Sequence, residues 1–428
     1  MTLAAFGLTA LSIFVLFSVS PLVLGGIGFN YETPGGGAYE KIHPGTFLAA
    51  FALICRIAAA RAPLLTAWKI FTASIGLTFF LGVWLALVTY AIVVLKIPFS
   101  PLIDTFLLPL IYAFLLRDMD ERSARMLAYL VGGILAANAV IALAEYLTGW
   151  RLFTFEAPPG TTADPSRTDL VFDWRASLAM EWRATALLGH PLQNGMVIGG
   201  LIVALASPGA NWIPPKIRWP LLGLEMLSMT AFGSRAALVM SLFIAFALLG
   251  LRLFLFLLRG DKLNLRAVAL AIFCLPLAAI AGMVLNETGF FDRLIERFGS
   301  DAGSAQTRIT MWELFRPIPF QDFLLGPDQD VVRTWQRMEG LEFGIESFWV
   351  GLPLTYGLLM SCLLFGGLAI LTASIVRLTG RGTAITFLFF FLVASTSSSI
   401  SGKTTALGMF VPIAFLLLRK NEAQNPPL

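Results

Sequence analysis

Long apolar runs, separated by short polar intervals, cover most of the chain. A helix that crosses a membrane needs about 20 predominantly apolar residues. Twelve runs approach this length, and they predict spans at residues 2–24, 44–60, 68–94, 97–116, 124–147, 190–207, 218–232, 236–258, 266–286, 346–375, 382–398 and 403–418. The last two runs are also compatible with one broken helix. The pattern predicts an all-α, polytopic membrane protein with about 12 transmembrane helices.

Two polar intervals are much longer than the others. The first covers residues 148–189, and the second covers residues 287–346, between the ninth and tenth predicted spans. We therefore divide the chain into a set of N-terminal membrane helices, residues 1–147, and a second membrane region, residues 148–428, which contains both long loops.

The placement of lysine and arginine predicts the orientation of the spans. Short cytoplasmic loops carry an excess of these residues. With both chain ends in the cytoplasm, the inside intervals hold Arg56, Arg61, Lys69, Arg117, Arg122, Arg125, Lys216, Arg218, Arg252, Arg259, Lys262, Arg266, Arg377, Arg381, Arg419 and Lys420. The four short external loops then hold one basic residue each, Lys41, Lys96, Arg235 and Lys403. Both long loops are then external.

The composition agrees with a membrane protein and argues against a soluble protein and a nucleic-acid-binding protein. The chain is 57% hydrophobic and 13% charged, whereas a soluble protein carries about 25% charged residues. The net charge of +4 follows from the topology, so it gives no support to nucleic-acid binding. Three cysteines at no metal-like spacing and two histidines also predict no metal site and no disulfide.

Each long loop ends close to the membrane. Proline favours the first position of a helix, so the sixth span is expected to begin near Pro191, with residues 184–189 dipping into the interface and Arg183 at its edge. In the second loop, residues 290–298 form an amphipathic segment that suits an interfacial helix. Ser304 then caps a further short helix, on which Arg308 and Trp312 share one face.

Arg183, Arg235 and Arg308 all fall at predicted external membrane edges. Guanidinium groups there can bind phosphate or carboxylate with two hydrogen bonds and keep their charge. The functional interpretation is a site for an anionic, membrane-borne group such as a lipid diphosphate. The alternative is that each arginine anchors its helix to lipid headgroups. Three arginines on separate spans, beside two long loops, favour the site.

Carboxylates and a histidine are the candidate proton acceptors. Glu225, Asp104 and Glu145 lie within predicted spans, where a charged residue is costly and is either functional or structurally paired. Glu346 opens the tenth span, where it is either a base or an ordinary carboxylate at a helix N-terminus. His190, between Gly189 and Pro191, is either a capping residue or a second candidate base.

An ordered set of short motifs resembles the O-antigen ligase and O-antigen polymerase family of bacterial envelope biosynthesis. The set covers about residues 183–375 and consists of Arg183-Ala-Thr-Ala-Leu-Leu-Gly-His190-Pro-Leu-Gln-Asn194, Gly233-Ser-Arg235-Ala-Ala-Leu238, Thr307-Arg308-Ile-Thr-Met-Trp312, Phe323-Leu-Leu-Gly326-Pro327, Glu346-Ser-Phe-Trp349 and Tyr356-Gly357. Each motif is short, and their order carries the resemblance.

The resemblance implies a multi-pass glycan transferase of the bacterial inner membrane with periplasmic loops. Such an enzyme moves a glycan from an undecaprenyl diphosphate carrier to the hydroxyl of an acceptor glycan or lipid, without metal or cofactor. By resemblance Arg183 and Arg308 hold the diphosphate, and Arg235 matches the arginine that opens a span. Ligases of the family carry a histidine where this chain has Glu346-Ser347, so the resemblance favours a polymerase or exopolysaccharide role.

A transporter or a flippase of lipid-linked saccharides is the alternative function. About twelve spans suit either, and Glu225 near the centre of its span favours transport. The second half of the chain does not repeat the first, however, and the polar residues gather outside the bilayer rather than at its midplane, where transport sites lie. The sequence therefore favours the transferase.

Overall fold

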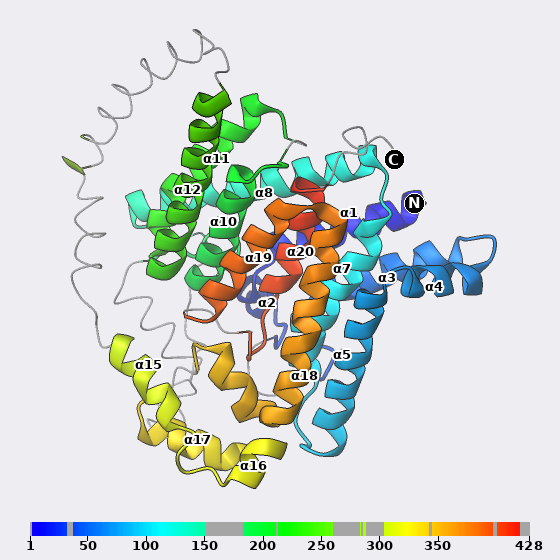
Figure 1. The fold of residues 1–428 in the computed structure, drawn as a ribbon, viewed down its shortest axis with the longest axis vertical. Coiled ribbons are helices and arrows are strands. Elements are labelled where there is room, and N and C mark those ends of the chain that lie inside the picture. Colours follow the sequence, from blue (N-terminus) through cyan, green and yellow to red (C-terminus); the bar gives the residue numbers. More distant parts are fainter. Residues whose placement is uncertain are drawn as a thin grey trace.

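The structure is a computed structural model that describes residues 2–31, 37–150, 152, 183–210, 213–259, 283, 286–287, 304–341, 345–396 and 400–419. Every regular element in these ranges is a helix, so the predicted all-α class is confirmed (Figure 1). The elements are α1 (Leu3–Ser18), α2 (Pro21–Gly26), α3 (Pro44–Ala58), α4 (Pro63–Thr72), α5 (Ile75–Val93), α6 (Ser100–Leu102), the π-helix η1 (Ile103–Leu107), α7 (Leu108–Arg117), α8 (Glu121–Thr148), α10 (Pro191–Ala206), α11 (Pro215–Phe232), α12 (Arg235–Arg259), α15 (Ser304–Glu313), α16 (Phe320–Leu325), α17 (Gln329–Met338), α18 (Phe348–Thr379), α19 (Arg381–Ala394) and α20 (Ala406–Leu417).

Five helical stretches of the described chain are long and apolar enough to cross a membrane: α5, the run from Ser100 to Arg117, α8, α12 and α18. Five shorter apolar helices accompany them, α1, α3, α10, α19 and α20. The chain is thus a helical membrane protein, and the count of twelve spans stays a prediction. The predicted span 266–286 and the amphipathic segment 290–298 lie almost wholly outside the described residues.

Two predicted spans are each divided in the structure. The span predicted at 2–24 breaks after α1, where the hydroxyl of Ser20 accepts a hydrogen bond from the N–H of Val23 and Pro21 begins α2. Proline has no N–H, so it cannot continue the hydrogen bonds of α1. The span predicted at 68–94 breaks between α4 and α5, where the Thr78 hydroxyl donates to the carbonyl of Phe71. The residues around both breaks are mostly apolar, so the hydropathy of the sequence does not predict where these helices end.

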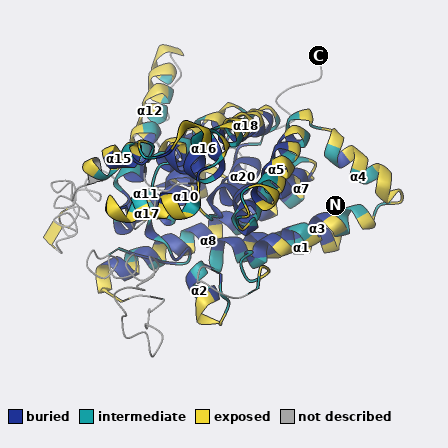
Figure 2. Ribbon diagram, turned by 90° about the horizontal axis from the view of Figure 1, so that it is seen from below, coloured by how far each residue is buried: buried dark blue, intermediate teal, exposed yellow. Residues whose placement is uncertain are grey.

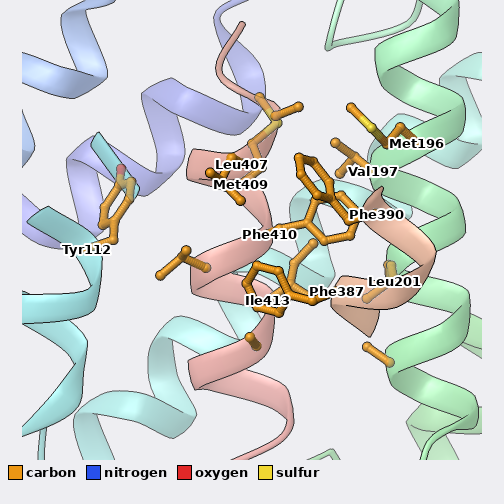
Figure 3. Close-up of a cluster of buried hydrophobic side chains, with 14 of the residues drawn as sticks. Tyr112, Met196, Val197, Leu201, Phe387, Phe390, Leu407, Met409, Phe410 and Ile413 are labelled. Atoms are coloured by element: carbon orange, nitrogen blue, oxygen red, sulfur yellow. The ribbon is translucent and has the colours of Figure 1, made fainter. Parts of the chain in front are cut away.

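Helix α20 lies at the centre of the bundle. Each of its residues is buried, and it packs against α7, α8, α10 and α19 (Figure 2). The rings of Phe390 and Phe410 are 4.6 Å apart. They lie beside the α10 side chains Met196, Val197 and Leu201 (Figure 3). A Cβ at Gly200 would lie 2.3 Å from the Phe410 ring, so this glycine makes room for the ring. The structure also shows α19 and α20 as separate helices rather than one broken helix.

Outer helices present large apolar side chains to the surroundings. On α12, Phe243 is 73% exposed and Leu258 is 67% exposed. On α5, Ile75 is 86% exposed. Apolar surface of this extent is unfavourable in water, whereas it costs nothing against lipid chains. The exposed faces therefore fit a bilayer as the medium around the helices (Figure 2).

At one end of the bundle, which we call the basic end, arginine side chains donate hydrogen bonds to carbonyls at or just beyond the C-terminal ends of helices. Arg218 donates to the carbonyls of Leu205 and Ser207, at the end of α10, over 2.6 and 3.1 Å. Arg56 donates to the last turn of α7, and Arg419 donates to the chain just beyond it. These carbonyls have no partner within their own helices, so the arginines both satisfy them and fix the ends of neighbouring helices together.

The basic end is predicted to face the cytoplasm. Its arginines belong to the excess of basic residues that marks inside loops. A reporter that is active only outside the cytoplasm is expected to be active when fused at Ser304 and inactive when fused at the C-terminus. A cytoplasmic signal from the Ser304 fusion would contradict the topology, since it would place α15 and its arginine on the wrong side.

A buried carboxylate ties together three segments at the opposite end. Asp104, in η1, accepts hydrogen bonds from the hydroxyls of Tyr31 and Thr46, over 2.8 and 2.6 Å, and from the N–H of His43 over 3.0 Å. Lys403 donates to the carbonyl of Tyr31 and lies over its ring. Asp104 thus has the bonded environment of a structural residue, one of the two roles open to a charge within a span.

Helix α18 is kinked at Gly357, which has a φ of 79°. The kink lets the chain at the end of α16 approach closely: a Cβ at Gly357 would lie 2.5 Å from the nitrogen of Gly326 and 2.7 Å from the carbonyl carbon of Leu325. The Gln329 side chain donates to the carbonyl of Leu354 over 3.0 Å, near the break in the helix. The loop 304–341 is therefore fixed to the kink of α18.

Gly357→Ala is expected to destabilise the protein strongly. A left-handed backbone costs an L-residue about 1–2 kcal/mol, and the new methyl group would also overlap the chain at 325–326. Thermal unfolding in detergent is expected to shift to lower temperature by several degrees. Gly366→Ala is the matched control, because it lies in the same helix and a Cβ there meets nothing within 4 Å. Equal unfolding temperatures for the two variants would contradict the assigned kink.

Candidate functional site

The segment before α10 lies against the helices without being helical. It runs from Arg183 to His190, and the residues at 184–186 and 188–189 are buried. Its N–H groups are bonded to fixed partners: Ala184 donates to the carbonyl of Ala231, at the end of α11, over 3.0 Å, and Thr185 donates to the Glu145 carboxylate over 2.8 Å. Arg183 is therefore attached to an anchored turn, and α10 begins at Pro191 as the proline predicts.

Two asparagines complete this anchorage. Asn138 of α8 accepts a hydrogen bond from the N–H of Leu187 over 2.9 Å and donates to Asn194 over 2.9 Å. Asn194, one turn into α10, donates to the carbonyls of Thr185 and His190 over 2.8 and 3.1 Å. Both side chains are fully buried. Neither asparagine is assigned a role from the sequence, although a polar side chain in an apolar run is a usable signal.

The second long loop is folded against the beginning of α18. Helices α15, α16 and α17 lie together at one end of the molecule (Figure 1), and a small hydrophobic core of their own joins them to α18. This core consists of Met311, Leu314, Ile318, Val332, Leu341, Val350 and Leu354. It sets the position of α15, which carries Arg308.

Arg308 lies against the end of α19. Its guanidinium donates to the carbonyl of Thr396 over 3.2 Å, and the side chain is otherwise exposed. The indole N–H of Trp349, near the start of α18, donates to the hydroxyl of Ser395 over 2.9 Å. The start of α18 and helix α15 therefore meet the same helix end. Trp312 is 60% exposed on the same helix as Arg308.

Glu346 joins these parts electrostatically. It lies two residues before α18 and is partly buried. Burial raises the pKa of its carboxyl, while the positive charges of Arg308 and Arg183 act in the opposite direction and lower it. Two arginines more than a hundred residues apart in the sequence thus act on one carboxylate. Arg183, Arg308 and Glu346 form what we call the arginine–glutamate site.

His190 lies beside this site. It occupies the N-cap position of α10, and its side chain makes no capping hydrogen bond. Burial and, to a smaller extent, the charge of Arg183 lower the pKa of its imidazole to about 4. The imidazole is therefore neutral near pH 7, so it is able to accept a proton, as a base must.

Arg235 belongs to a neighbouring turn. It is the first residue of α12, directly after Ser234, and a Cβ at Gly195 of α10 would lie 2.6 Å from the Cβ of Ser234. The turn therefore touches α10 close to Asn194 and the anchored segment. The charges that act on Glu346 are those of Arg308 and Arg183, so Arg235 forms the border of the site rather than its centre.

The three carboxylates within helices have different environments. Both carboxyl oxygens of Asp104 and both of Glu145 accept hydrogen bonds. Glu225, in the middle of α11, is buried, and neither of its carboxyl oxygens has a hydrogen-bond partner within the described residues. The Ser228 hydroxyl donates to the main-chain carbonyl of Glu225 instead.

No family model, curated protein or solved structure matches the chain. The functional argument therefore rests on the residues of the site. Among the motifs that carry the resemblance, Arg183, Arg308 and Glu346 meet electrostatically, and Gly326 and Gly357 meet at the kink of α18.

Proposed function

We propose that the protein is a glycan transferase of the bacterial inner membrane. It takes a glycan from an undecaprenyl diphosphate carrier and joins it to the hydroxyl of an acceptor glycan or lipid, as a polymerase or ligase of envelope polysaccharide. The arginine–glutamate site supports the proposal: Arg308 of α15 and Trp349 near the start of α18 both bind the end of α19, and the charges of Arg308 and Arg183 lower the pKa of Glu346.

The chemistry needs two kinds of group, and the site contains both. The acceptor oxygen attacks the anomeric carbon of the donor sugar, the bond from that carbon to the diphosphate breaks, and undecaprenyl diphosphate leaves with its added negative charge. Fixed guanidinium groups stabilise that charge, which is the role of Arg183 and Arg308. Glu346 takes the hydroxyl proton, and His190 is the second candidate for this step.

Several features make the arrangement suitable for a membrane-borne donor. Arg183 is the first residue of a turn that is packed into the helical bundle. Arg308 lies on helix α15 of the second long loop, together with the exposed Trp312. A diphosphate at the membrane edge is thus reachable from both. Its polyprenyl chain would remain in the lipid, against the exposed apolar faces of the outer helices.

Transport of a lipid-linked saccharide is the second candidate function. Glu225 supports it, because a buried carboxyl without a hydrogen-bond partner is rarely kept for structure alone. Glu225 lies in a different part of the fold from the arginine–glutamate site, between α8 and α10, against which α11 packs. A single carboxyl without a hydrogen-bond partner among the described residues is less than a transport site needs, so the transferase is the better supported function.

Reconstitution separates the two functions. The purified chain in proteoliposomes, given a lipid-linked oligosaccharide on the side of α15, is expected to produce joined glycans and free undecaprenyl diphosphate. A flippase would move the lipid-linked oligosaccharide across the bilayer without lengthening it. Movement without joining would contradict the proposal, and so would cells lacking the protein that accumulate no lipid-linked glycan.

Glycan joining is expected to fall in acid. A base must be ionised, and burial raises the pKa of Glu346 above its ordinary value of 4.5. The acid limb of kcat/KM should therefore have its midpoint above pH 4.5, with activity lost as the pH falls through the raised pKa. Arg308→Gln removes the charge that lowers this pKa, so it should move the midpoint to higher pH. A midpoint at or below pH 4.5 would be evidence against Glu346 as the base.

A further inference from the structure

The carboxylate of Glu145 is bound by main-chain N–H groups. Glu145 lies near the end of α8 and is fully buried. One oxygen accepts from Thr185 and Ala186 over 2.8 and 3.0 Å, and the other accepts from Leu152 over 2.9 Å. All three donors follow α8 in the sequence, and two of them belong to the turn that begins at Arg183.

This turn needs such an acceptor. Irregular backbone at membrane depth is stable only where its polar groups are satisfied by protein or water. Glu145 takes the N–H groups of Thr185 and Ala186, and Asn138 takes the next one. Ala186 has a φ of 40°, in the left-handed region that an alanine rarely adopts. A conformation of this kind persists only when surrounding contacts hold it.

We infer that Glu145 is a positioning residue for Arg183 in the binding of an anionic diphosphate donor. The inference rests on the proposed function. Glu145 does not touch the site; it fixes the two peptide groups that follow Ala184, and so fixes the direction in which Arg183 leaves the anchored turn. Glu145 accepts its hydrogen bonds from main-chain N–H groups, and the charge of Arg183 acts on the carboxyl of Glu346.

The role requires a carboxylate. Two oxygens of Glu145 accept three N–H groups, whereas the amide of a glutamine has one oxygen and would turn its own N–H groups toward a donor. Glu145→Gln therefore keeps the shape and loses part of the anchorage. Glu145→Asp keeps both oxygens on a shorter chain, so it is the variant expected to recover part of the function.

Steady-state kinetics of the full-length protein test the inference. Glu145→Gln is expected to raise the KM for an undecaprenyl-diphosphate-linked oligosaccharide about tenfold, with kcat within about twofold. In an Arg183→Ala background the same substitution should have no further effect on KM, because the residue through which it acts is gone. Glu121→Gln is the matched control: it removes an exposed carboxylate of the same helix, paired only with Arg125 in the described structure.

The outcomes are distinct. An unchanged KM in Glu145→Gln, or an equal rise of KM with and without Arg183, would overturn the inference. If Glu145→Gln does not fold, Glu145→Asp replaces it in the same cycle. Binding of undecaprenyl diphosphate to the variants in nanodiscs needs no turnover, so it decides the coupling even if the wild type joins no glycans. A wild type that binds undecaprenyl diphosphate but joins no glycans would refute the proposed function alone. A wild type that binds no undecaprenyl diphosphate would refute both the proposed function and the role of Glu145.

Discussion

Glu346→Gln is expected to lower the rate of glycan joining by about 10²–10⁴-fold, which is the usual cost of losing a general base. The glutamine has nearly the same shape, so folding should persist. Donor binding should also persist or become slightly tighter, because Arg183 and Arg308 lose a competing negative charge. The reduction is therefore expected in kcat rather than in KM for the donor.

The rate is measured with a lipid-linked oligosaccharide in detergent, and donor binding is measured separately. Glu339→Gln is the control, since Glu339 is an exposed carboxylate after α17 in the same loop. If Glu346→Gln joins glycans at the normal rate, the carboxylate is structural. The proton acceptor to examine is then His190, whose imidazole is neutral near pH 7 because burial lowers its pKa to about 4.

Arg308→Lys is expected to weaken donor binding by about 10- to 100-fold. A guanidinium binds a phosphate with two parallel hydrogen bonds, whereas an ammonium group acts as a single point charge. Hydrogen bonds to charged groups contribute about 1.5–3 kcal/mol each. The lysine also loses the contact by which Arg308 reaches the carbonyl of Thr396, so the new charge would be held less firmly at the end of α19.

The dissociation constant for the lipid-linked donor checks this expectation. Arg316→Lys is a suitable comparison, because Arg316 lies just beyond the same helix and its side chain is 78% exposed beside Glu313. A loss of affinity in Arg316→Lys equal to that in Arg308→Lys would mean that the loop attracts the donor by charge alone. Arg308 would then be a headgroup anchor, the alternative that the sequence leaves open.

Local signals in the sequence predict the parts of the site that depend on neighbouring residues. Pro191 predicts the start of α10 because proline is favoured at the first position of a helix. The helix at Ser304 and the placement of Arg308 on it follow from a similar local pattern, although Ser304 is the first helical residue rather than its cap. Charge spacing along the chain also predicts which arginines gather at the basic end.

Local sequence patterns do not predict contacts between residues that are distant in the sequence. Nothing near Glu145 in the sequence indicates that two of its three partners, Thr185 and Ala186, lie about forty residues later. Likewise, Gly357 lies within an apolar run, and its close approach to Gly326 at the end of α16 is a contact between residues distant in the sequence. Glycine is common in membrane spans, so its presence alone does not predict a kink.

The composition of α11 has a consequence for how the protein is made. A charged residue near the middle of a helix raises the cost of its insertion into the bilayer by about 2.5–3.5 kcal/mol. Helix α11 carries Glu225 at its middle and Lys216 and Arg218 at its start, while α12 follows after a two-residue turn and is long and apolar. Helix α11 is thus a poor substrate for the insertion machinery by itself. We expect α11 to insert only together with α12, as a helical hairpin. Truncating the nascent chain before Arg235 should therefore leave α11 on the membrane surface.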